Sequence, residues 1–299
     1  MEKVLIIYHR VDFDGAFSGS IANKFAREIG CITELFGWTY GDDIPDIKYL
    51  EKFNRVVLVD LSFPPEVMIY LKSQNNFEVI WIDHHTTAIN NSYSNNYSDI
   101  EGLRRDGTAA CELCWEYFYP ALILPKVVEF IGCYDVWDKT RYSWDNIILP
   151  FQYGLRTRYS IKAFMISPQA FNNLIFENID LDEIIHEGEI ILKYLDRSWN
   201  SACKVYSFDV KVAGKYRGIC ILTTEFTSNI FNSVRDNYDV VICCNRRGPD
   251  VYNLSMYKDT NKCPEFSCGG YRWFSGQKCA AGCTVNFEEF KKLITECEI

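Results

Sequence analysis

Carboxylates and imidazoles stand at the ends of three apolar runs, "KVLIIYH", "RVVLVDL" and "VIWIDHH", or directly after them. Three of the four histidines in the chain occur there. A single Asp in such a place is more often a turn residue or helix cap, and a single His more often a satisfied polar group. Their coincidence favours a shared metal site. The candidate residues are His9, Asp12, Asp14, Asp60, Asp83, His84 and His85.

The mixture of imidazole and carboxylate indicates the class of metal. Such ligands suit Mn²⁺, Fe²⁺, Co²⁺ or Zn²⁺, whereas Mg²⁺ or Ca²⁺ fits an all-oxygen site better. Several carboxylates in one crevice would repel one another, and two cations about 3.5–4 Å apart, sharing one carboxylate, would relieve this repulsion. Phosphatases and nucleases use this arrangement to activate water and to stabilise phosphoryl charge. We therefore expect two Mn²⁺ ions, with Mg²⁺, Co²⁺, Fe²⁺ or Zn²⁺ as alternatives.

The first half of the chain alternates apolar runs with helical patterns. "KVLIIYH" precedes the helix-like "GAFSGSIANKFAREIG", and "PPEVMIYLKSQ", with proline in its first turn, separates "RVVLVDL" from "VIWIDHH". This alternation predicts βαβ units and a mostly parallel sheet. Parallel strands end at one edge of the sheet, and ligands bind in the crevice beyond that edge. The predicted topology would therefore bring the candidate side chains together.

The second half predicts another, smaller α/β domain. Residues 181–205 have the apolar spacing of a helix, and short strand candidates and one helix candidate, residues 228–236, follow. We predict a metal-binding domain over residues 1–180, a connecting helix over 181–205 and a C-terminal substrate-binding domain over 206–299. The active site would lie in the cleft between the domains. The Asn- and Ser-rich segment 89–99 is predicted to be a surface loop.

Composition and charge restrict the class of partner. The 299 residues are 48% hydrophobic and 24% charged, and no apolar stretch approaches the roughly 18–20 residues of a membrane span. With no recognisable signal peptide, we expect a cytoplasmic protein with no membrane partner. The net charge of −9 argues against a long nucleic-acid duplex but permits a short phosphate-bearing ligand. The sequence leaves the oligomeric state open, a homodimer included.

We expect the thirteen cysteines to be reduced thiols, because a long chain without a signal peptide is typical of a reducing compartment. Two groupings are weaker zinc candidates, because buried cysteine is a common small apolar residue. One is the pair Cys111 and Cys114. The other is the set Cys263, Cys268, Cys279 and Cys283.

Four segments in chain order resemble the motifs of the DHH phosphoesterase superfamily: "YHRVDFDG", "VVLVDLSF", "WIDHH" and "CYDVWD". That superfamily includes RecJ-type exonucleases, nanoRNA oligoribonucleases, cyclic-dinucleotide phosphodiesterases, exopolyphosphatases and family II pyrophosphatases. Residues 106–120 are similar to the helical segment that leads into the fourth motif. The resemblance covers most of the chain.

The resemblance implies two metals that share the carboxylate of Asp60. One metal would be held by His9, Asp12 and Asp60. The other would be held by Asp14, Asp60, His84 and Asp135. The choice of Asp135 over Asp138 rests on the resemblance alone. His9 and Asp12 are separated by two residues, one fewer than in many relatives.

The resemblance also implies roles for two residues beside the metals. His85 would contact the scissile phosphate as an electrostatic stabiliser or proton donor. Asp83 would orient a neighbouring imidazole, as metal-bound histidines usually require.

The C-terminal segment resembles the DHH-associated domain, in which a glycine-rich loop grips the terminal phosphate or base of the substrate. Here Gln277 stands where histidine is usual, and "NLSMYK" lacks the arginine that often ends the preceding strand. Solvated surface charges are the alternative interpretation of the basic residues. The substrate-binding candidates are Arg246, Arg247, Arg272, Gly276, Gln277, Lys278 and Gly282.

Together these observations predict a Mn²⁺-dependent phosphodiesterase that hydrolyses short oligonucleotides or cyclic and linear dinucleotides. An exopolyphosphatase or pyrophosphatase, acting on phosphoanhydrides, is the enzymatic alternative. A non-catalytic nucleotide-binding module is the alternative from another class. The complete set of carboxylates favours an enzyme, whereas Gln277 and the missing arginine favour the binding module.

Overall fold

The computed structural model describes residues 1–159, 173–175, 179–224, 227–258, 262–269, 271–272, 274–276 and 279–295. The chain divides into two compact units, Met1–Ile191 and Leu192–Ile299. A long helix, α10 (Leu181–Tyr206), occupies the segment where the sequence predicts a helix and runs across the division. The domain boundaries predicted at residues 180 and 206 therefore stay a prediction.

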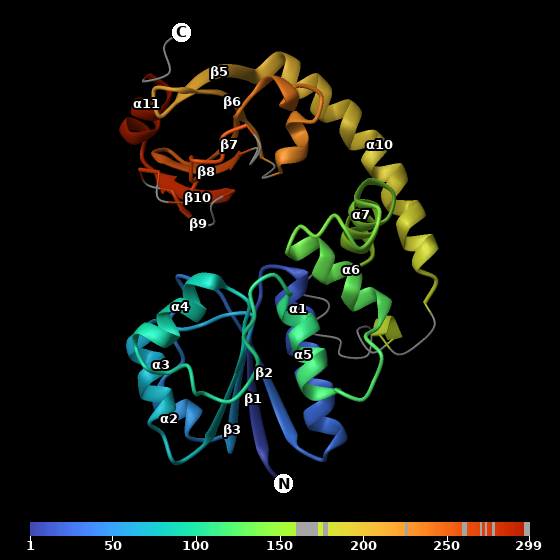
Figure 1. Ribbon diagram of the computed structural model, residues 1–299, viewed down its shortest axis with the longest axis vertical. Coiled ribbons are helices and arrows are strands. Elements are labelled where there is room, and N and C mark those ends of the chain that lie inside the picture. The colour runs from blue at the N-terminus through green and yellow to red at the C-terminus, as the bar shows by residue number, and fades with distance from the viewer. Residues whose placement is uncertain are drawn as a thin grey trace. The chain divides into compact units, whose positions relative to one another are not determined.

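The N-terminal unit contains a four-stranded parallel sheet in the order β2-β1-β3-β4. Its central residues are almost fully buried because helices cover both faces, which suits the unbroken apolar runs. Figure 1 shows α2, α3 and α4 on one face and α1 and α5 on the other. The strands are β1 (Lys3–His9), β2 (Ile32–Trp38), β3 (Arg55–Val59) and β4 (Glu78–Ile82).

The helices of this unit begin and end where the sequence offers caps and breakers. Asp12 caps α1 by accepting from the Gly15 amide, and α3 has proline in its first turn. The π-helical turn η1 (Trp144–Ile148) leads directly into the last of them. The helices are α1 (Phe13–Glu28), α2 (Ile47–Leu50), α3 (Pro65–Lys72), α4 (Thr86–Ser94), α5 (Ala110–Phe118), α6 (Lys126–Asp135) and α7 (Leu149–Arg158).

The prediction of a surface loop over residues 89–99 is wrong for the first half of this segment, which belongs to α4. Ala88 and Ser92 are buried on one side of this helix, and the Ser92 hydroxyl donates to the Ile89 carbonyl. Tertiary packing of that side outweighs the weak helix propensity of Asn and Ser.

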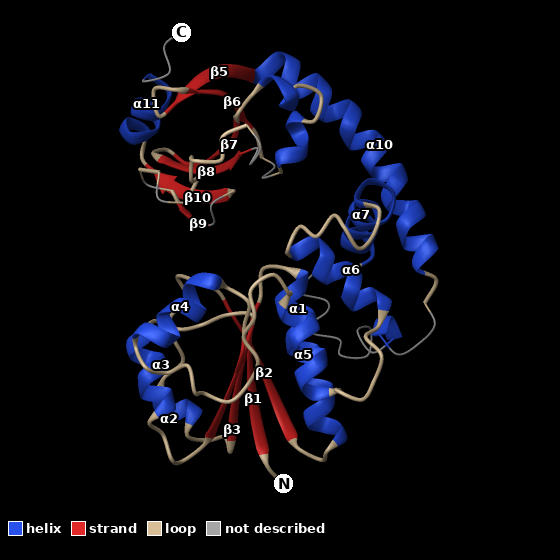
Figure 2. Cartoon of the chain, in the orientation of Figure 1, coloured by secondary structure: helices blue, strands red, loops and turns tan. Residues whose placement is uncertain are grey.

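The C-terminal unit is built on a six-stranded mixed sheet in the order β5-β6-β7-β8-β10-β9 (Figure 2). Strands β6 and β7 pair in parallel, and the other described pairs are antiparallel. The helix α11 (Phe287–Thr295) follows the sheet. The strands are β5 (Ser207–Val212), β6 (Tyr216–Leu222), β7 (Val240–Gly248), β8 (Val251–Lys258), β9 (Ser275–Gly276) and β10 (Ala280–Val285).

The helix predicted over residues 228–236 is wrong. The segment forms two short 3₁₀ turns, η2 (Ser228–Phe231) and η3 (Arg235–Asn237). Its Asn, Ser and Asp side chains compete for backbone groups and favour turns, while Ile230 and Phe231 are buried.

The fold class is the one that the sequence predicts, a mostly parallel α/β N-terminal part with a second, mixed-sheet part. Among the helices in the described part of the chain, none combines the length and the apolarity that crossing a membrane requires.

Candidate metal centre

The carboxyl ends of three parallel strands bring the candidate residues together. His9 is the last residue of β1, Asp60 follows β3 directly, and Asp83 and His84 follow β4 directly. Since β1, β3 and β4 are neighbours in the parallel sheet, these positions meet at one edge. The structure therefore places at one site residues that are up to 75 positions apart in sequence.

The first cluster surrounds the Nδ1 atom of His9. This atom lies 3.1 Å from Oδ2 of Asp12 and 3.5 Å from Oδ2 of Asp60. One ligand atom from each of the three residues lies within 4.8 Å of the others. They are the three residues that the resemblance assigns to one metal.

The second cluster surrounds the Nε2 atom of His84. This atom lies 3.3 Å from Oδ1 of Asp60, 3.4 Å from Oδ2 of Asp135 and 3.7 Å from Oδ2 of Asp14. Asp135 is the last residue of α6 and lies far from the strand ends in sequence. This cluster contains the residues that the resemblance assigns to the second metal.

Asp60 lies between the two clusters, and its two oxygens face different imidazoles. Oδ2 faces His9 and Oδ1 faces His84. The residue is 2% exposed and has a φ of 60°, in the left-handed region that Asp and Asn tolerate better than most residues. Its amide donates to the Ile82 carbonyl at 2.9 Å, which holds this backbone against β4. The backbone thus orients the two oxygens of one carboxylate toward both imidazoles.

Backbone amides hold the carboxylate of Asp14 in place. Its two oxygens accept from the amides of Ala110 and Cys111 at 2.9 and 2.7 Å. These amides belong to the first residues of α5, where unpaired N–H groups and the helix dipole favour an anion. Asp14 is therefore oriented by a helix terminus that comes almost one hundred residues later in the chain.

Asp83 organises the two histidines that follow it. Its Oδ1 accepts from the amides of His84 and His85 at 2.8 and 3.2 Å and lies 2.7 Å from Nδ1 of His85. This contact assigns the proton of the His85 ring to Nδ1, so its Nε2 is left for a ligand. Asp83 is fully buried, and the Arg105 amide donates to its carbonyl.

His9 provides a test of whether the residues fit a metal. Its Nδ1 is buried, and the nearby oxygens of Asp12 and Asp60 lie outside hydrogen-bonding geometry, while its Nε2 lies 3.3 Å from the Thr39 hydroxyl. A ring whose Nε2 donates to a hydroxyl presents the lone pair of Nδ1, as metal-binding histidines do. Together with the carboxylates, this donor set fits two divalent cations of the Mn²⁺ class.

Burial and mutual repulsion perturb the pKa values of the cluster. Burial, followed by the charges of Asp14 and Asp12, raises the pKa of Asp60 well above its usual value. Burial and the charge of Asp14 do the same for the pKa of Asp135. Burial lowers the pKa of His9, but Asp12 and Asp60 outweigh it and raise the pKa to about 10. The cluster is therefore short of positive charge, which divalent cations would supply.

A pH-dependent stability of the metal-free protein follows. A group whose folded-state pKa is raised loses its stabilising contribution as the pH rises from its unfolded-state pKa through its folded-state pKa. Asp60, Asp135 and His9 all have raised values, so metal-free protein becomes less stable from pH 6 to pH 9. We expect the difference in unfolding midpoint between Mn²⁺-loaded and EDTA-treated protein to grow over this range, as measured by scanning calorimetry. A difference that shrinks toward pH 9 would contradict this.

The predicted substrate residues of the C-terminal unit that the structure describes come from several different segments. The guanidinium of Arg246 donates to the carbonyls of Gly248 and Pro249. Arg247 is exposed, and Arg272 stands over the Tyr271 ring. Gly276 and Gly282 belong to β9 and β10, which pair at this end of the sheet. Gln277 and Lys278 lie outside the described residues.

The position where relatives often have arginine is occupied by Lys258, at the end of β8. Its ammonium is buried and donates to the carbonyls of Cys263 at 2.8 Å and of Phe266. Lys258 therefore holds the following segment rather than facing solvent.

The zinc alternatives receive no support from the structure. Cys111 and Cys114 are fully buried in the core, and this burial raises the pKa of both thiols. Within the described residues, no cysteine belongs to a group placed to hold a metal.

A cavity of about 420 Å³ adjoins the clusters and includes Asp12, Asp14 and Asp135 in its wall. Its amide and guanidinium groups belong to Gln152 and Arg156 of α7, which no motif in the sequence marks. Their four-residue spacing places them on one side of a helix, but nothing in that spacing distinguishes a cavity wall from a surface. Only the packing of α7 reveals them.

Comparison with known proteins agrees with this geometry. Residues 3–129 match the DHH family, N-terminal domain. No curated protein matches the sequence.

Three solved structures illustrate the likeness. An exopolyphosphatase-related protein from Bacteroides fragilis is 14% identical, with 99% of this chain and 91% of that chain covered and a TM-score of 0.54. The DHH domain of a member of a family of ribosomal proteins is 14% identical, with 99% and 85% covered and a TM-score of 0.53. The exonuclease RecJ bound to manganese is 13% identical, with 99% and 89% covered and a TM-score of 0.48.

At these identities the first two likenesses establish the fold, while the family match and the strand-end motifs identify the N-terminal domain. Residues 3–129 therefore carry an N-terminal domain of the DHH family, whose members are typically phosphoesterases.

Proposed function

We propose that the protein is a metal-dependent phosphodiesterase that hydrolyses short oligonucleotides or cyclic and linear dinucleotides. The observation that carries the proposal is the position of Asp60, whose two oxygens face two separate His-and-Asp clusters. A shared carboxylate between two such clusters is the ligand arrangement of two-metal phosphoryl-transfer sites.

The residues divide into two sets of ligands. The first metal would be held by His9, Asp12 and Asp60, and the second by Asp14, Asp60, His84 and Asp135. When bound, the two divalent cations, of which Mn²⁺ suits these ligands best, lower the pKa of a water nucleophile and stabilise charge on the phosphoryl oxygens.

His85 would contact the phosphoryl group of the substrate, and Asp83 would orient the His85 ring. Asp83 accepts a hydrogen bond from the Nδ1–H of His85 and thereby keeps the ring in one orientation. Burial lowers the pKa of His85, but Asp83 and Asp60 outweigh it and raise the pKa, which favours the doubly protonated ring. Nε2 of that ring can donate a hydrogen bond or proton to a phosphoryl oxygen or leaving group. The side chain of His85 is 35% exposed, more than the 10% of His84, as a substrate contact requires.

The C-terminal unit would add contacts to the phosphates of the substrate. Arg247 and Arg272 are the exposed basic residues that we propose for this role, together with the glycine-containing stretch at Gly276 and Gly282.

A substrate panel tests the proposal directly. Purified protein with Mn²⁺ should release mononucleotides from di- to pentanucleotides or open a cyclic dinucleotide, and EDTA should abolish the reaction. Phosphate release from polyphosphate or pyrophosphate alone would assign a phosphoanhydride hydrolase instead. Stoichiometric nucleotide binding without product would identify a non-catalytic binding module.

A further inference from the structure

The cavity next to the metal centre has a composition that the metal chemistry does not explain. Its wall is largely apolar and aromatic beyond the three carboxylates that also belong to the metal clusters. Its volume of about 420 Å³ lies within the roughly 300–1,000 Å³ of small-molecule sites. The other residues of the wall are Val11, Phe13, Ile131, Tyr134, Gln152, Arg156 and Tyr159.

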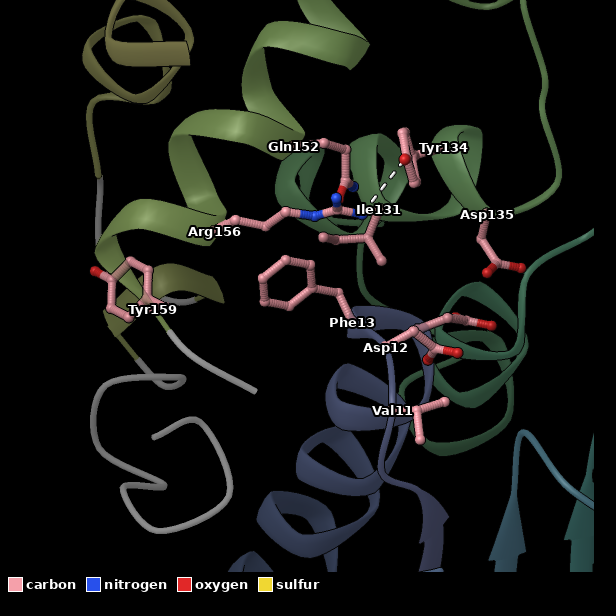
Figure 3. A pocket seen from close by; sticks show the side chains of 10 residues that line it. Val11, Asp12, Phe13, Ile131, Tyr134, Asp135, Gln152, Arg156 and Tyr159 are labelled. Carbon is pink, nitrogen blue, oxygen red and sulfur yellow. Dashed lines mark hydrogen bonds between the residues drawn. The ribbon is translucent and has the colours of Figure 1, made fainter. Parts of the chain in front are cut away.

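Gln152 is the unusual member of this wall. It is 1% exposed, and its amide nitrogen makes no hydrogen bond within the described part of the chain. A buried amide group without a partner costs free energy, so such a group is expected to meet a ligand. Figure 3 shows the Gln152 amide directed into the cavity, above Ile131 and beside Arg156.

The backbone of α7 holds Gln152 rigidly. A Cβ atom added to Gly154 would lie 1.9 Å from the Ile184 carbonyl oxygen, and one added to Gly188 would lie 1.7 Å from the Pro150 carbonyl oxygen. These close approaches fix α7 against the first turns of α10, because only glycine permits them. The amide of Gln152 is therefore presented in a fixed place.

Arg156 is the single cation among the described lining residues. Its Nη2 donates to the Tyr134 hydroxyl at 3.3 Å, and its guanidinium stands 5.6 Å from the centre of the Tyr134 ring. The Tyr134 ring also stacks on Trp144, with 5.7 Å between the ring centres and an angle of 5° between the ring planes. Arg156 and Tyr134 are thus held together as one polar edge of an otherwise apolar wall.

This wall discriminates among phosphate-bearing ligands. A polyphosphate chain needs cations along its length, and a sugar phosphate needs many hydrogen-bonding groups for its hydroxyls. A nucleobase instead presents flat apolar faces and an edge of donors and acceptors, which an apolar wall with one amide and one guanidinium would match. Figure 3 shows Asp12 and Asp135 on one side of the cavity and Tyr159 on the other, with Phe13 and Ile131 between them.

We propose that this cavity binds the nucleobase adjacent to the scissile phosphate, with Gln152 and Arg156 bonding to the edge of the base. This inference rests on the proposed function and narrows its substrate class to nucleotides. It also makes Gln152 a specificity-determining residue.

The first experiment measures binding and needs no turnover. Calorimetric titration with Ca²⁺ present should show nucleoside 5′-monophosphates binding about tenfold or more tightly than ribose 5-phosphate, because the base adds hydrogen bonds and apolar contact. Gln152→Leu keeps the side-chain volume but removes the amide. In this variant the ratio of the two affinities, nucleoside monophosphate over ribose 5-phosphate, should fall to about two or less. Equal affinities in the wild-type protein, or an unchanged ratio in the variant, would overturn the inference.

The second experiment measures hydrolysis with Mn²⁺. Gln152→Leu should lower kcat/KM for a dinucleotide about tenfold. For bis(p-nitrophenyl) phosphate, a phosphodiester without a base, kcat/KM of the variant should stay within about twofold of the wild-type value. Equal loss on both substrates would contradict a base-reading role. Absence of all hydrolysis by the wild-type protein would reject the proposed function, while the binding ratio would still decide the role of the cavity.

Two further variants test whether a reduced ratio results from misfolding or from an effect unrelated to the cavity. Arg156→Gln changes an exposed side chain and should reduce the same binding ratio without moving the unfolding midpoint. Gln74→Leu is the matched control, because this amide bonds to the Tyr70 carbonyl and the Ser73 hydroxyl at the end of α3 and does not line the cavity. A reduced ratio in Gln74→Leu would count against the inference.

Discussion

Asp60→Asn is expected to abolish metal binding at both clusters and yet to stabilise the metal-free protein. The amide cannot provide two charged oxygens to two cations, so metal content should fall from two ions per chain to none. Loss of several kcal/mol of charge stabilisation corresponds to a fall in kcat of about 10³-fold or more. Elemental analysis and steady-state kinetics measure these two effects.

The stabilisation has an electrostatic cause. The pKa of Asp60 is raised, so its ionised form opposes folding at pH 8 when no metal is present. Asn removes that charge and keeps the left-handed backbone at φ 60°, which Ala would strain. We expect the EDTA-treated variant to unfold about 2–4 °C above EDTA-treated wild type. Mn²⁺ should raise the midpoint of the wild type alone.

Two results would refute the bridging role of Asp60. One is a variant that retains a single tightly bound metal at full occupancy, which would mean that the clusters are independent. The other is a metal-free variant less stable than metal-free wild type, which would mean that Asp60 stabilises the fold as an anion.

His85→Ala is expected to lower kcat without removing metal. The Nδ1 proton of His85 is directed to Asp83, and Nε2 remains for the substrate. Loss of a positioned proton donor typically costs about 10²–10⁴-fold in rate. We expect a fall in kcat within that range, with two metals still bound and little change in KM.

The matched control for this variant is His186→Ala. His186 lies on α10 with 71% of its side chain exposed, so its removal should change neither rate nor metal content. If His85→Ala loses one metal, the residue is a ligand. Asp60, His84 and His85 could form such a site, because one ligand atom from each lies within 4.8 Å of the others. The role proposed for His85 would then be wrong.

Strain and burial at the site are consistent with a functional rather than a structural arrangement. Asp60 adopts a positive φ, and Oδ2 of the buried Asp83 has no hydrogen-bond partner in the part of the chain that the structure describes. Such costs persist where the surrounding structure enforces them, and they are concentrated at sites that bind or react. The metal-free cluster is thus held in a conformation that binding would stabilise.

Much of the metal centre could be predicted from the sequence because it depends on local rules. Unbroken apolar runs separated by helical patterns indicate parallel strands, and parallel strands present their last residues at one edge. His9, Asp60 and His84 follow from that argument alone, and the structure places them within one site. The left-handed backbone of Asp60 has no such signal, because it results from the contact with β4.

Other features depended on contacts that no local pattern encodes. The Asn- and Ser-rich segment 89–99 predicts a loop from its composition, but burial of Ala88 and Ser92 makes its first half helical. Only the resemblance favours Asp135 over Asp138 as a metal ligand. In the structure Asp138 accepts from Arg141 and Thr140 instead.

The sequence by itself determined the parallel sheet and the chemistry at its edge, because strand periodicity and strand order follow from short stretches of residues. The tertiary structure alone decided which helix ends complete the site and which residues line the cavity. The amides of Ala110 and Cys111 reach Asp14, and Gln152 reaches the cavity, only through the packing of α5 and α7. Such contacts join distant segments, and their geometry is set by the shape of the packed core rather than by spacing along the chain.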